Sequence, residues 1–146
     1  MFVPSIESLS NKLNFTRSSL DADGTVRVPG AMLKFLLQIA LTATEFNEGA
    51  YLKENPDVAE AVERGDIESA YLHYIGFGYF EGRPGGGPQV DEDWYLKKYP
   101  DVASGIRNAQ INSASQHFHR VGAAEGRSPS ADQLDSATQW KRALRR

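Results

Sequence analysis

The chain contains an internal duplication, and this duplication constrains its fold more than any other feature of the sequence. Residues 46–84 and 90–128 align without a gap at an offset of about 44 residues, with about 16 of 39 positions identical. The shared elements are Tyr-Leu-Lys, Pro-Asp-Val-Ala, a histidine and Glu-Gly-Arg, in the same order and at the same spacing. A motif that occurs twice in one small chain is more typical of a scaffold than of a lone catalytic centre.

Each copy predicts three short helical pieces. In the first copy, the first piece begins at Asn47, a residue type that caps helices, and ends before a proline. Pro56 suits the first position of the second helix, and Asp57 favours its positive end. The third piece runs through His73 to Gly78, which we expect to be a left-handed cap, before the Glu-Gly-Arg turn. The corresponding residues of the second copy are Asp91, Pro100, Asp101, His117 and Gly122.

Residues 1–44 precede the two copies and have no counterpart in them. After a short first helix, residues 14–28 predict a β-hairpin, because strand-tolerant residues flank the Asp-Gly dipeptide at 23–24. Apolar residues then recur with helical spacing over 31–43, and this helix is apolar nearly all round. This helix is expected to pack against the rest of the leader, against the first copy or against a partner chain, since it would otherwise expose a large apolar patch.

The predicted architecture is therefore mainly α, with two tandem helical repeats behind a small leader. The expected parts are a leader with a hairpin and an apolar helix (1–44), a first repeat (45–84), a Gly/Pro linker (85–89), a second repeat (90–129) and a C-terminal capping helix (130–146). Four of the last six residues are Lys or Arg. These cations either complement the dipole of the last helix or make a weak contact with an anionic membrane surface or polyanion.

Charge and composition exclude several classes of protein. A formal net charge of −3 is unlike the dense positive field that phosphate binding requires, so a nucleic-acid partner is not expected. The absence of cysteine excludes disulfides, thiolate zinc sites and cysteine nucleophiles. The N-terminal residues do not resemble a signal peptide, and the longest apolar stretch is shorter than the roughly 20 residues of a membrane span. We expect no transmembrane segment and a cytoplasmic location, with export by a non-classical route left open.

The equivalent histidines, His73 and His117, are the first candidates for catalysis or metal binding. No second ligand or orienting acid stands at a spacing that would bring it beside them. We favour packed, hydrogen-bonded histidines that tie the third helical piece to the rest of each copy. The acidic segment 21–24 lacks the glutamate that closes a calcium loop, because position 12 of such a loop is Met32. The sequence therefore predicts no catalytic residue, no metal site and no cofactor.

The two Glu-Gly-Arg turns have two interpretations. Glycine permits a turn that other side chains block, and the flanking acid and base could bind a sugar hydroxyl or a carboxylate. Alternatively, Arg83 and Arg127 each pair with the aspartate of their own copy, which explains why Asp and Arg recur together. We favour this structural lock.

Aromatic residues are divided unevenly between the copies. Tyr79 and Phe80 stand where the second copy has Ala123 and Ala124. Exposed aromatic side chains stack on sugar rings or fill pockets of a partner protein, whereas the other interpretation is that the leader helix packs on them. Recognition is expected where the copies differ, because these positions are released from the common scaffold.

The string of Tyr-Leu, Pro-Asp-Val-Ala, His-Tyr or His-Phe, Gly and Glu-Gly-Arg resembles a short tandem repeat of bacterial proteins. That repeat occurs beside glycosyltransferase domains and in polysaccharide-related or surface-associated proteins, and the resemblance covers residues 46–129. It implies an accessory module in an envelope or polysaccharide context, with no catalytic residue to carry over. The chain contains no glycosyltransferase domain, and its leader matches no family that we can name.

We therefore expect a non-catalytic adaptor or accessory subunit that binds another protein, or a second copy of itself. The alternative is a carbohydrate-binding module. Candidate contacts with a partner or a glycan are Met32, Phe35, Ile39, Tyr79, Phe80, Arg83, Trp94 and Arg127, and the structural positions of the motif are Pro56, Asp57, His73, Pro100, Asp101 and His117.

Overall fold

The computed structural model describes residues 1–21 and 23–145, and its regular structure is helical. These residues form nine α-helices, with short 3-10 and π segments and no strand, which confirms the prediction of a mainly α protein. None of the helices in this part of the chain has the length and apolar character needed to cross a bilayer. The chain divides near residue 43 into two compact units, and each is described by itself.

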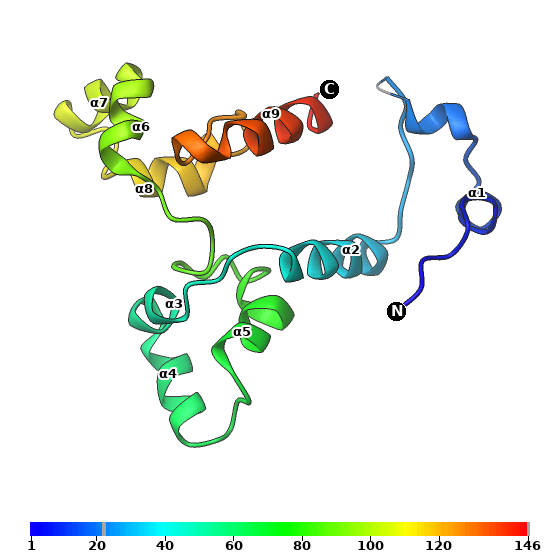
Figure 1. Cartoon of the computed structure of the whole chain (residues 1–146), viewed down its shortest axis with the longest axis horizontal. Helices are drawn as coiled ribbons and strands as arrows, with labels where there is room; N and C mark the ends of the chain where they lie inside the picture. Colours follow the sequence, from blue (N-terminus) through cyan, green and yellow to red (C-terminus); the bar gives the residue numbers. More distant parts are fainter. Residues whose placement is uncertain (22, 146) are drawn as a thin grey trace. The chain divides into compact units, whose positions relative to one another are not determined.

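The first unit, the leader, contains α1 (Ile6–Leu13), the 3-10 segment η1 (Arg17–Leu20) and α2 (Gly30–Thr42) (Figure 1). Ser5 caps α1, because its hydroxyl accepts a hydrogen bond from the Ser8 amide at 3.2 Å. Asn14 ends this helix in the left-handed region, with φ 53°. None of the described leader residues is buried, so this unit has no core of its own.

The hairpin predicted for residues 14–28 is wrong for the described residues, and Ala22 lies outside them. The hydroxyl-rich segment after Asn14 forms η1 instead, since Thr16 and Ser19 make reciprocal capping contacts. A tight turn does form, with the Gly24 amide donating to the Asp21 carbonyl at 2.8 Å. No strands extend from it, because a two-stranded ribbon is only marginally stable without a third strand or a covering helix.

The second unit contains both copies of the duplicated sequence and the C-terminal helix. The first copy forms α3 (Glu48–Glu54), α4 (Pro56–Glu63) and α5 (Ala70–His73), which continues into the π segment η2 (Tyr74–Gly78). The second copy forms α6 (Glu92–Lys98), α7 (Pro100–Arg107), α8 (Ala114–His117) and the π segment η3 (Phe118–Gly122). The short η4 (Ala131–Gln133) then leads into α9 (Leu134–Ala143).

Local sequence signals set the ends of these helices. Asn47 caps α3 by accepting a hydrogen bond from the Ala50 amide at 2.9 Å, and Ser69 caps α5 by accepting one from the Leu72 amide at 3.1 Å. Pro56 stands at the start of α4, where its missing N–H costs no helical hydrogen bond. Asp91, Pro100 and Ser113 occupy the same positions in the second copy.

Each copy encloses a small core. Tyr51, Val58, Ala70 and Tyr74 are buried in the first copy, and Tyr95, Val102, Ala114 and Phe118 are buried at the equivalent positions of the second. The helix α9 buries Ala137, and the Lys141 stem lies against Gly126, where an added Cβ would come within 2.5 Å of it. The Asp91 amide donates to the Pro129 carbonyl at 3.0 Å, which closes the second copy before α9 begins.

The left-handed glycine of each copy is not the predicted one. Gly78 lies inside the π segment, and the positive φ belongs to Gly82 of the Glu-Gly-Arg turn, at 69°. Gly78 is required for a different reason, because a Cβ there would overlap the Tyr51 hydroxyl. Gly126 and Gly122 repeat this division of roles in the second copy, with φ 79° at Gly126.

Candidate functional site

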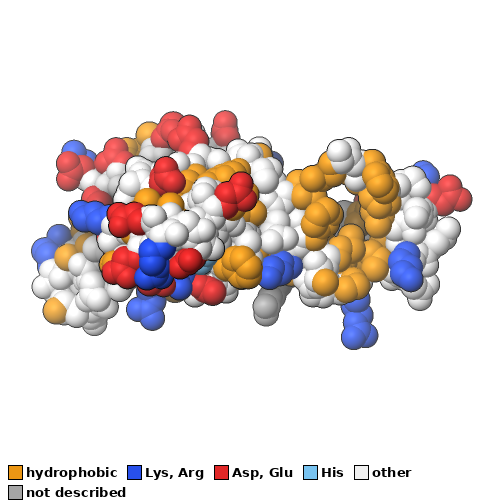
Figure 2. All heavy atoms as spheres, turned by 90° about the horizontal axis from the view of Figure 1, so that it is seen from below, with side chains coloured by type: hydrophobic (Ala, Val, Ile, Leu, Met, Phe, Trp, Pro, Cys, Tyr) orange, Lys and Arg blue, Asp and Glu red, His pale blue; other side chains and the backbone are white. Residues whose placement is uncertain are grey.

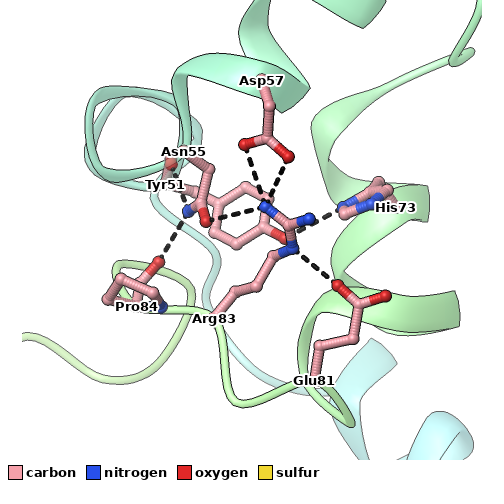
Figure 3. A network of polar contacts seen from close by, with 7 residues as sticks. All are labelled: Tyr51, Asn55, Asp57, His73, Glu81, Arg83 and Pro84. Atoms are coloured by element: carbon pink, nitrogen blue, oxygen red, sulfur yellow. Dashed lines mark hydrogen bonds and ion pairs between the residues drawn. The ribbon is translucent and has the colours of Figure 1, made fainter.

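A polar network joins the Glu-Gly-Arg turn of the first copy to the start of α4 (Figure 3). The Arg83 Nη1 atom donates to both carboxylate oxygens of Asp57, at 2.9 and 2.8 Å, and Arg83 Nε donates to Glu81 at 2.6 Å. Asn55 Oδ1 accepts a longer hydrogen bond from the same Nη1 atom at 3.4 Å. The arginine therefore makes its side-chain contacts inside its own copy.

Backbone geometry brings these charges together. The left-handed Gly82 reverses the chain after η2, and the Arg83 amide donates to the Gly78 carbonyl at 2.9 Å. Asp57 stands in the first turn of α4, directly after Pro56. The turn and the helix start thus meet although 26 residues separate the arginine from the aspartate.

The second copy repeats the network with better geometry. Arg127 Nη1 and Nη2 each donate to one carboxylate oxygen of Asp101, at 2.8 and 2.7 Å, and Arg127 Nε donates to Glu125 at 2.8 Å. The guanidinium also lies over the ring of Tyr99, 5.0 Å from its centroid. The interpretation of both turns as locks agrees with these contacts.

The two copies make different hydrogen bonds at the backbone position that follows the Glu-Gly-Arg turn. Pro84 has no N–H, and its carbonyl accepts a hydrogen bond from the side chain of Asn55 at 2.9 Å. Its counterpart Ser128 has an N–H, which donates to the Tyr99 hydroxyl at 2.9 Å. Asn55 and Tyr99 are themselves counterparts, so a donor faces the proline and an acceptor faces the serine.

The two motif histidines are bound to buried tyrosines. Tyr51 Oη and His73 Nδ1 lie 2.9 Å apart, and Tyr95 Oη and His117 Nδ1 lie 3.0 Å apart. Both tyrosines are fully buried. Burial raises the pKa of Tyr95 to about 12 and also raises the pKa of Tyr51, so both phenols are neutral at physiological pH. The histidines therefore tie the third helical piece of each copy to the first.

The electrostatics of the networks are those of paired charges. Hydrogen bonds from Arg83 lower the pKa of Asp57, and those from Arg127 lower the pKa of Asp101. The same contact with Asp101 raises the pKa of Arg127. Among the described residues, no buried side-chain nitrogen or oxygen lacks a hydrogen-bond partner, and no group of three potential metal ligands was found.

Four large apolar side chains, three of them aromatic, are exposed along α5, η2 and the turn that follows in the first copy. We define this aromatic patch as Leu72, Phe77, Tyr79 and Phe80. Phe77 is 61% exposed, more than the predicted candidates Tyr79 and Phe80, which are 39% and 37% exposed. The rings of Tyr79 and Phe80 contact each other edge to face, with centroids 5.1 Å apart. Phe77 belongs to the aromatic set that distinguishes the first copy, since Val121 replaces it in the second, but it was not among the predicted contacts.

The remaining candidates of the second copy converge on one ring. Trp94 packs edge to face on Tyr99, with centroids 6.2 Å apart, and Arg127 lies over the same ring. Trp94 is half-buried and belongs to the small core around Tyr95. These two candidates are thus brought together by Tyr99, a residue that sequence reasoning did not single out.

The leader carries the other predicted contacts. On α2, Phe35 is 53% exposed, whereas Met32 and Ile39 are half-buried. Leu33 and Leu36, which were not predicted as contacts, are 50% and 47% exposed. Figure 2 shows hydrophobic side chains gathered around a hollow over the leader, at the right of the view.

The C-terminal helix combines exposed apolar and basic side chains. Trp140 and Leu144 are 54% and 52% exposed, and both lie on α9 or at its end. Lys141 and Arg142 lie in the last turn of this helix, where cations complement the helix dipole. Arg146, the last residue of the predicted basic end, lies outside the described residues.

Comparison with known proteins finds no relative. The chain matches no protein-family model, no curated protein and no solved structure.

Proposed function

We propose that the protein is a non-catalytic adaptor or accessory subunit built on two tandem helical repeats. Its apolar helix α2 and the aromatic patch of the first copy would bind another protein. The observation that carries this proposal is the exposure of Leu33, Phe35 and Leu36, each about half open to solvent on one short helix. A helix that is apolar nearly all round belongs in a protein interior or at an interface.

The polar networks support a scaffold role for the copies. Arg83 and Arg127 are held by carboxylates of their own copy, and each histidine is held by a buried tyrosine. A catalytic centre needs an acid, base or nucleophile aimed at a substrate, and these groups are aimed at one another. The same contacts recur in both copies, which is what a shared structural requirement produces.

The resemblance of residues 46–129 to the bacterial tandem repeat supports a context for this function. Proteins with that repeat are polysaccharide-related or surface-associated, and the repeat there is an accessory module. We therefore propose that the partner belongs to bacterial envelope or polysaccharide biology.

Affinity purification from the native cell tests the adaptor function. The full chain is compared with Phe35→Ser and with the control Trp140→Ser, which removes an equally exposed aromatic ring, 54% against 53%, from α9. We expect a partner protein in stoichiometric amount with the wild type and the control, and its loss with Phe35→Ser. The purified partner should then rebind the purified wild-type chain. Recovery of the chain without a partner, or equal behaviour of the two variants, would contradict the proposal.

A carbohydrate-binding module is the alternative, and the aromatic patch favours it. Phe77 and Tyr79 present exposed rings, and aromatic rings stack on sugar faces. Arg83 and Arg127 are weaker glycan contacts than the sequence indicated, because they are already bound to carboxylates. In this alternative, Phe77→Ala removes saccharide affinity on a glycan array while the melting temperature stays within about 2 °C of the wild type.

A further inference from the structure

The Gly/Pro linker between the two copies is packed against both of them. Gly86 is buried, and Gly85 and Gly87 are half-buried, whereas the glycines of a flexible tether are exposed to solvent. A Cβ at Gly85 would lie 2.7 Å from the Ala50 carbonyl oxygen, and one at Gly86 would overlap the Tyr74 ring. The first two glycines of the linker therefore lie on the first copy, where only a residue without a side chain fits.

The next two residues of the linker contact the second copy through one side chain. A Cβ at Gly87 would lie 2.9 Å from His119 Cε1 and 3.3 Å from His119 Nδ1, so the glycine backbone lies directly against the imidazole ring. The Pro88 carbonyl accepts a hydrogen bond from the same ring. The first copy has Ile75 at the position of His119, so only the second copy has an ionisable ring at this place.

The two contacts leave no free segment between them, because Gly86 and Gly87 are consecutive. If the contact with His119 alone is lost, the free segment runs over residues 87–90, since the Asp91 amide still donates to the Pro129 carbonyl at 3.0 Å. Four extended residues span up to about 13 Å. Loss of this one contact therefore allows the two copies to change their separation and orientation.

His119 is the group in this contact that titrates near neutral pH. The residue keeps access to solvent, so its ring can take up a proton while the copy stays folded. Burial of the ring lowers the pKa of His119, and the hydrogen bond to Pro88 opposes this effect in part. The surrounding groups are uncharged, because the linker segment and the adjoining Phe118 ring, with centroids 5.1 Å apart, have no ionisable group. On its own element, the next residue, Arg120, is exposed.

We propose that the linker is a pH-dependent hinge, which holds the two copies in one orientation while His119 is neutral and opens when His119 is protonated. A charged imidazolium requires hydration, and the packed glycine excludes part of that water. Because the pKa of His119 is lowered in the closed state, the contact contributes its full stability above the ordinary histidine pKa, about 6.5, and loses it as the pH falls through the lowered pKa. The hinge changes how the two copies are presented and does not depend on the identity of a partner.

Single-molecule energy transfer between dyes on the two copies tests the hinge. The full chain contains no cysteine, so Glu63→Cys and Arg107→Cys place the dyes at the exposed last residues of α4 and α7. We expect one narrow distance distribution at about pH 7.5, and a distribution at least about twice as wide at about pH 5.5. A narrow distribution at both pH values, or a wide one at both, overturns the inference.

His119→Gln tests whether the histidine is the group that responds to acid. Glutamine can still donate a hydrogen bond to the Pro88 carbonyl but carries no charge, so the distribution should stay narrow at both pH values. Arg120→Gln is the matched control, because it removes a charge from the next, exposed residue of η3 and leaves the imidazole in place. This control should open with acid as the wild type does. Equal acid responses of the two variants would contradict the assignment to His119.

Gly87→Ala tests the packing contact without a change of charge. The added Cβ would displace the His119 ring, so the distribution should be wide already at about pH 7.5, although alanine by itself restricts a chain more than glycine does. Gly76→Ala, with nothing within 4 Å of its Cβ position, should leave the distribution narrow. Circular dichroism of the wild type should show the same helix content at both pH values. Loss of helix over this range would mean that a copy unfolds, and would overturn the hinge.

Discussion

Arg127 binds both carboxylate oxygens of Asp101 through two different nitrogens, at 2.8 and 2.7 Å, although the two residues are 26 positions apart. In the first copy, Arg83 contacts both oxygens of Asp57 through a single nitrogen, Nη1. The second lock also has the Tyr99 ring under its guanidinium. The same motif therefore closes its two copies with different contact geometry.

Arg127→Lys should destabilise the protein by about 1 kcal/mol, because lysine cannot reproduce the two-nitrogen contact or lie flat on an aromatic ring. Arg83→Lys should cost less, about 0.5 kcal/mol, since a single nitrogen makes the contact with Asp57. Urea unfolding monitored by circular dichroism measures both. If Arg83→Lys lowers the free energy of unfolding more than Arg127→Lys does, the number of contacting nitrogens does not determine how much each arginine contributes to stability.

Removing the hydroxyl that binds each histidine should destabilise the copy that contains it. Tyr95→Phe leaves His117 Nδ1 without the partner that now lies 3.0 Å away, at a cost of about 1–2 kcal/mol. Tyr51→Phe should have a similar effect through His73. Thermal unfolding is the measurement, with Tyr71→Phe as a control. Unchanged melting of both variants would mean that the histidines do not tie the helices together.

Gly78→Ala should be among the most damaging small substitutions in the chain. The added Cβ would overlap the Tyr51 hydroxyl inside the core, and we expect a loss of about 2–3 kcal/mol. Gly76→Ala is the matched control, because nothing lies within 4 Å of the Cβ position in the same segment. This control should be neutral or stabilising by up to about 1 kcal/mol. In a Tyr51→Phe background, the cost of Gly78→Ala should fall.

Acid should weaken both locks. Arg127 lowers the pKa of Asp101, and Arg83 lowers the pKa of Asp57. A carboxyl whose pKa is depressed in the folded state contributes its stability above the unfolded pKa, about 3.9, and loses it as the pH falls through the folded pKa. The urea midpoint of the wild type should therefore fall between about pH 5 and pH 2.

The control for the acid experiment is a pair of carboxylate substitutions. Asp101→Asn should flatten the acid dependence, because the variant has already lost the titrating partner of Arg127. Glu63→Gln, an exposed carboxylate at the end of α4, should leave the dependence unchanged. If the urea midpoint falls equally with pH in the wild type and in both variants, the Arg–Asp pairs do not contribute to the acid sensitivity.

Much of the helical structure could be predicted because its signals are local. Pro56 and Pro100 begin helices, and Asn47, Asp91, Ser69 and Ser113 cap them, in each case through groups within three or four residues. The pairing of Arg83 with Asp57 was also accessible, since both residues recur in the second copy. The structure of residues 14–28 was predicted wrongly as a hairpin. The hydroxyl contacts between Thr16 and Ser19 favour the 3-10 segment η1 over the strand preference of the neighbouring residues.

The candidate site depended more on contacts between distant residues. The partner of His73 is Tyr51, 22 positions away, and no spacing in the sequence shows that Gly78 has to make room for the same hydroxyl. Phe77 is the most exposed ring of the first copy although it lies in the segment that supplies the core residue Tyr74. Its exposure follows from the π turn of η2, which changes the face that each side chain presents.

The sequence by itself determined the duplication, the helix starts and stops, and the charges that recur in pairs, because these depend on short-range steric and hydrogen-bonding preferences. Tertiary structure decided which groups meet. It assigned each histidine to a tyrosine, gave the left-handed conformation to Gly82 and left Leu33 and Leu36 of α2 about half exposed. These outcomes depend on how much apolar surface each helix buries against the others. The buried area is defined only when the whole chain is packed.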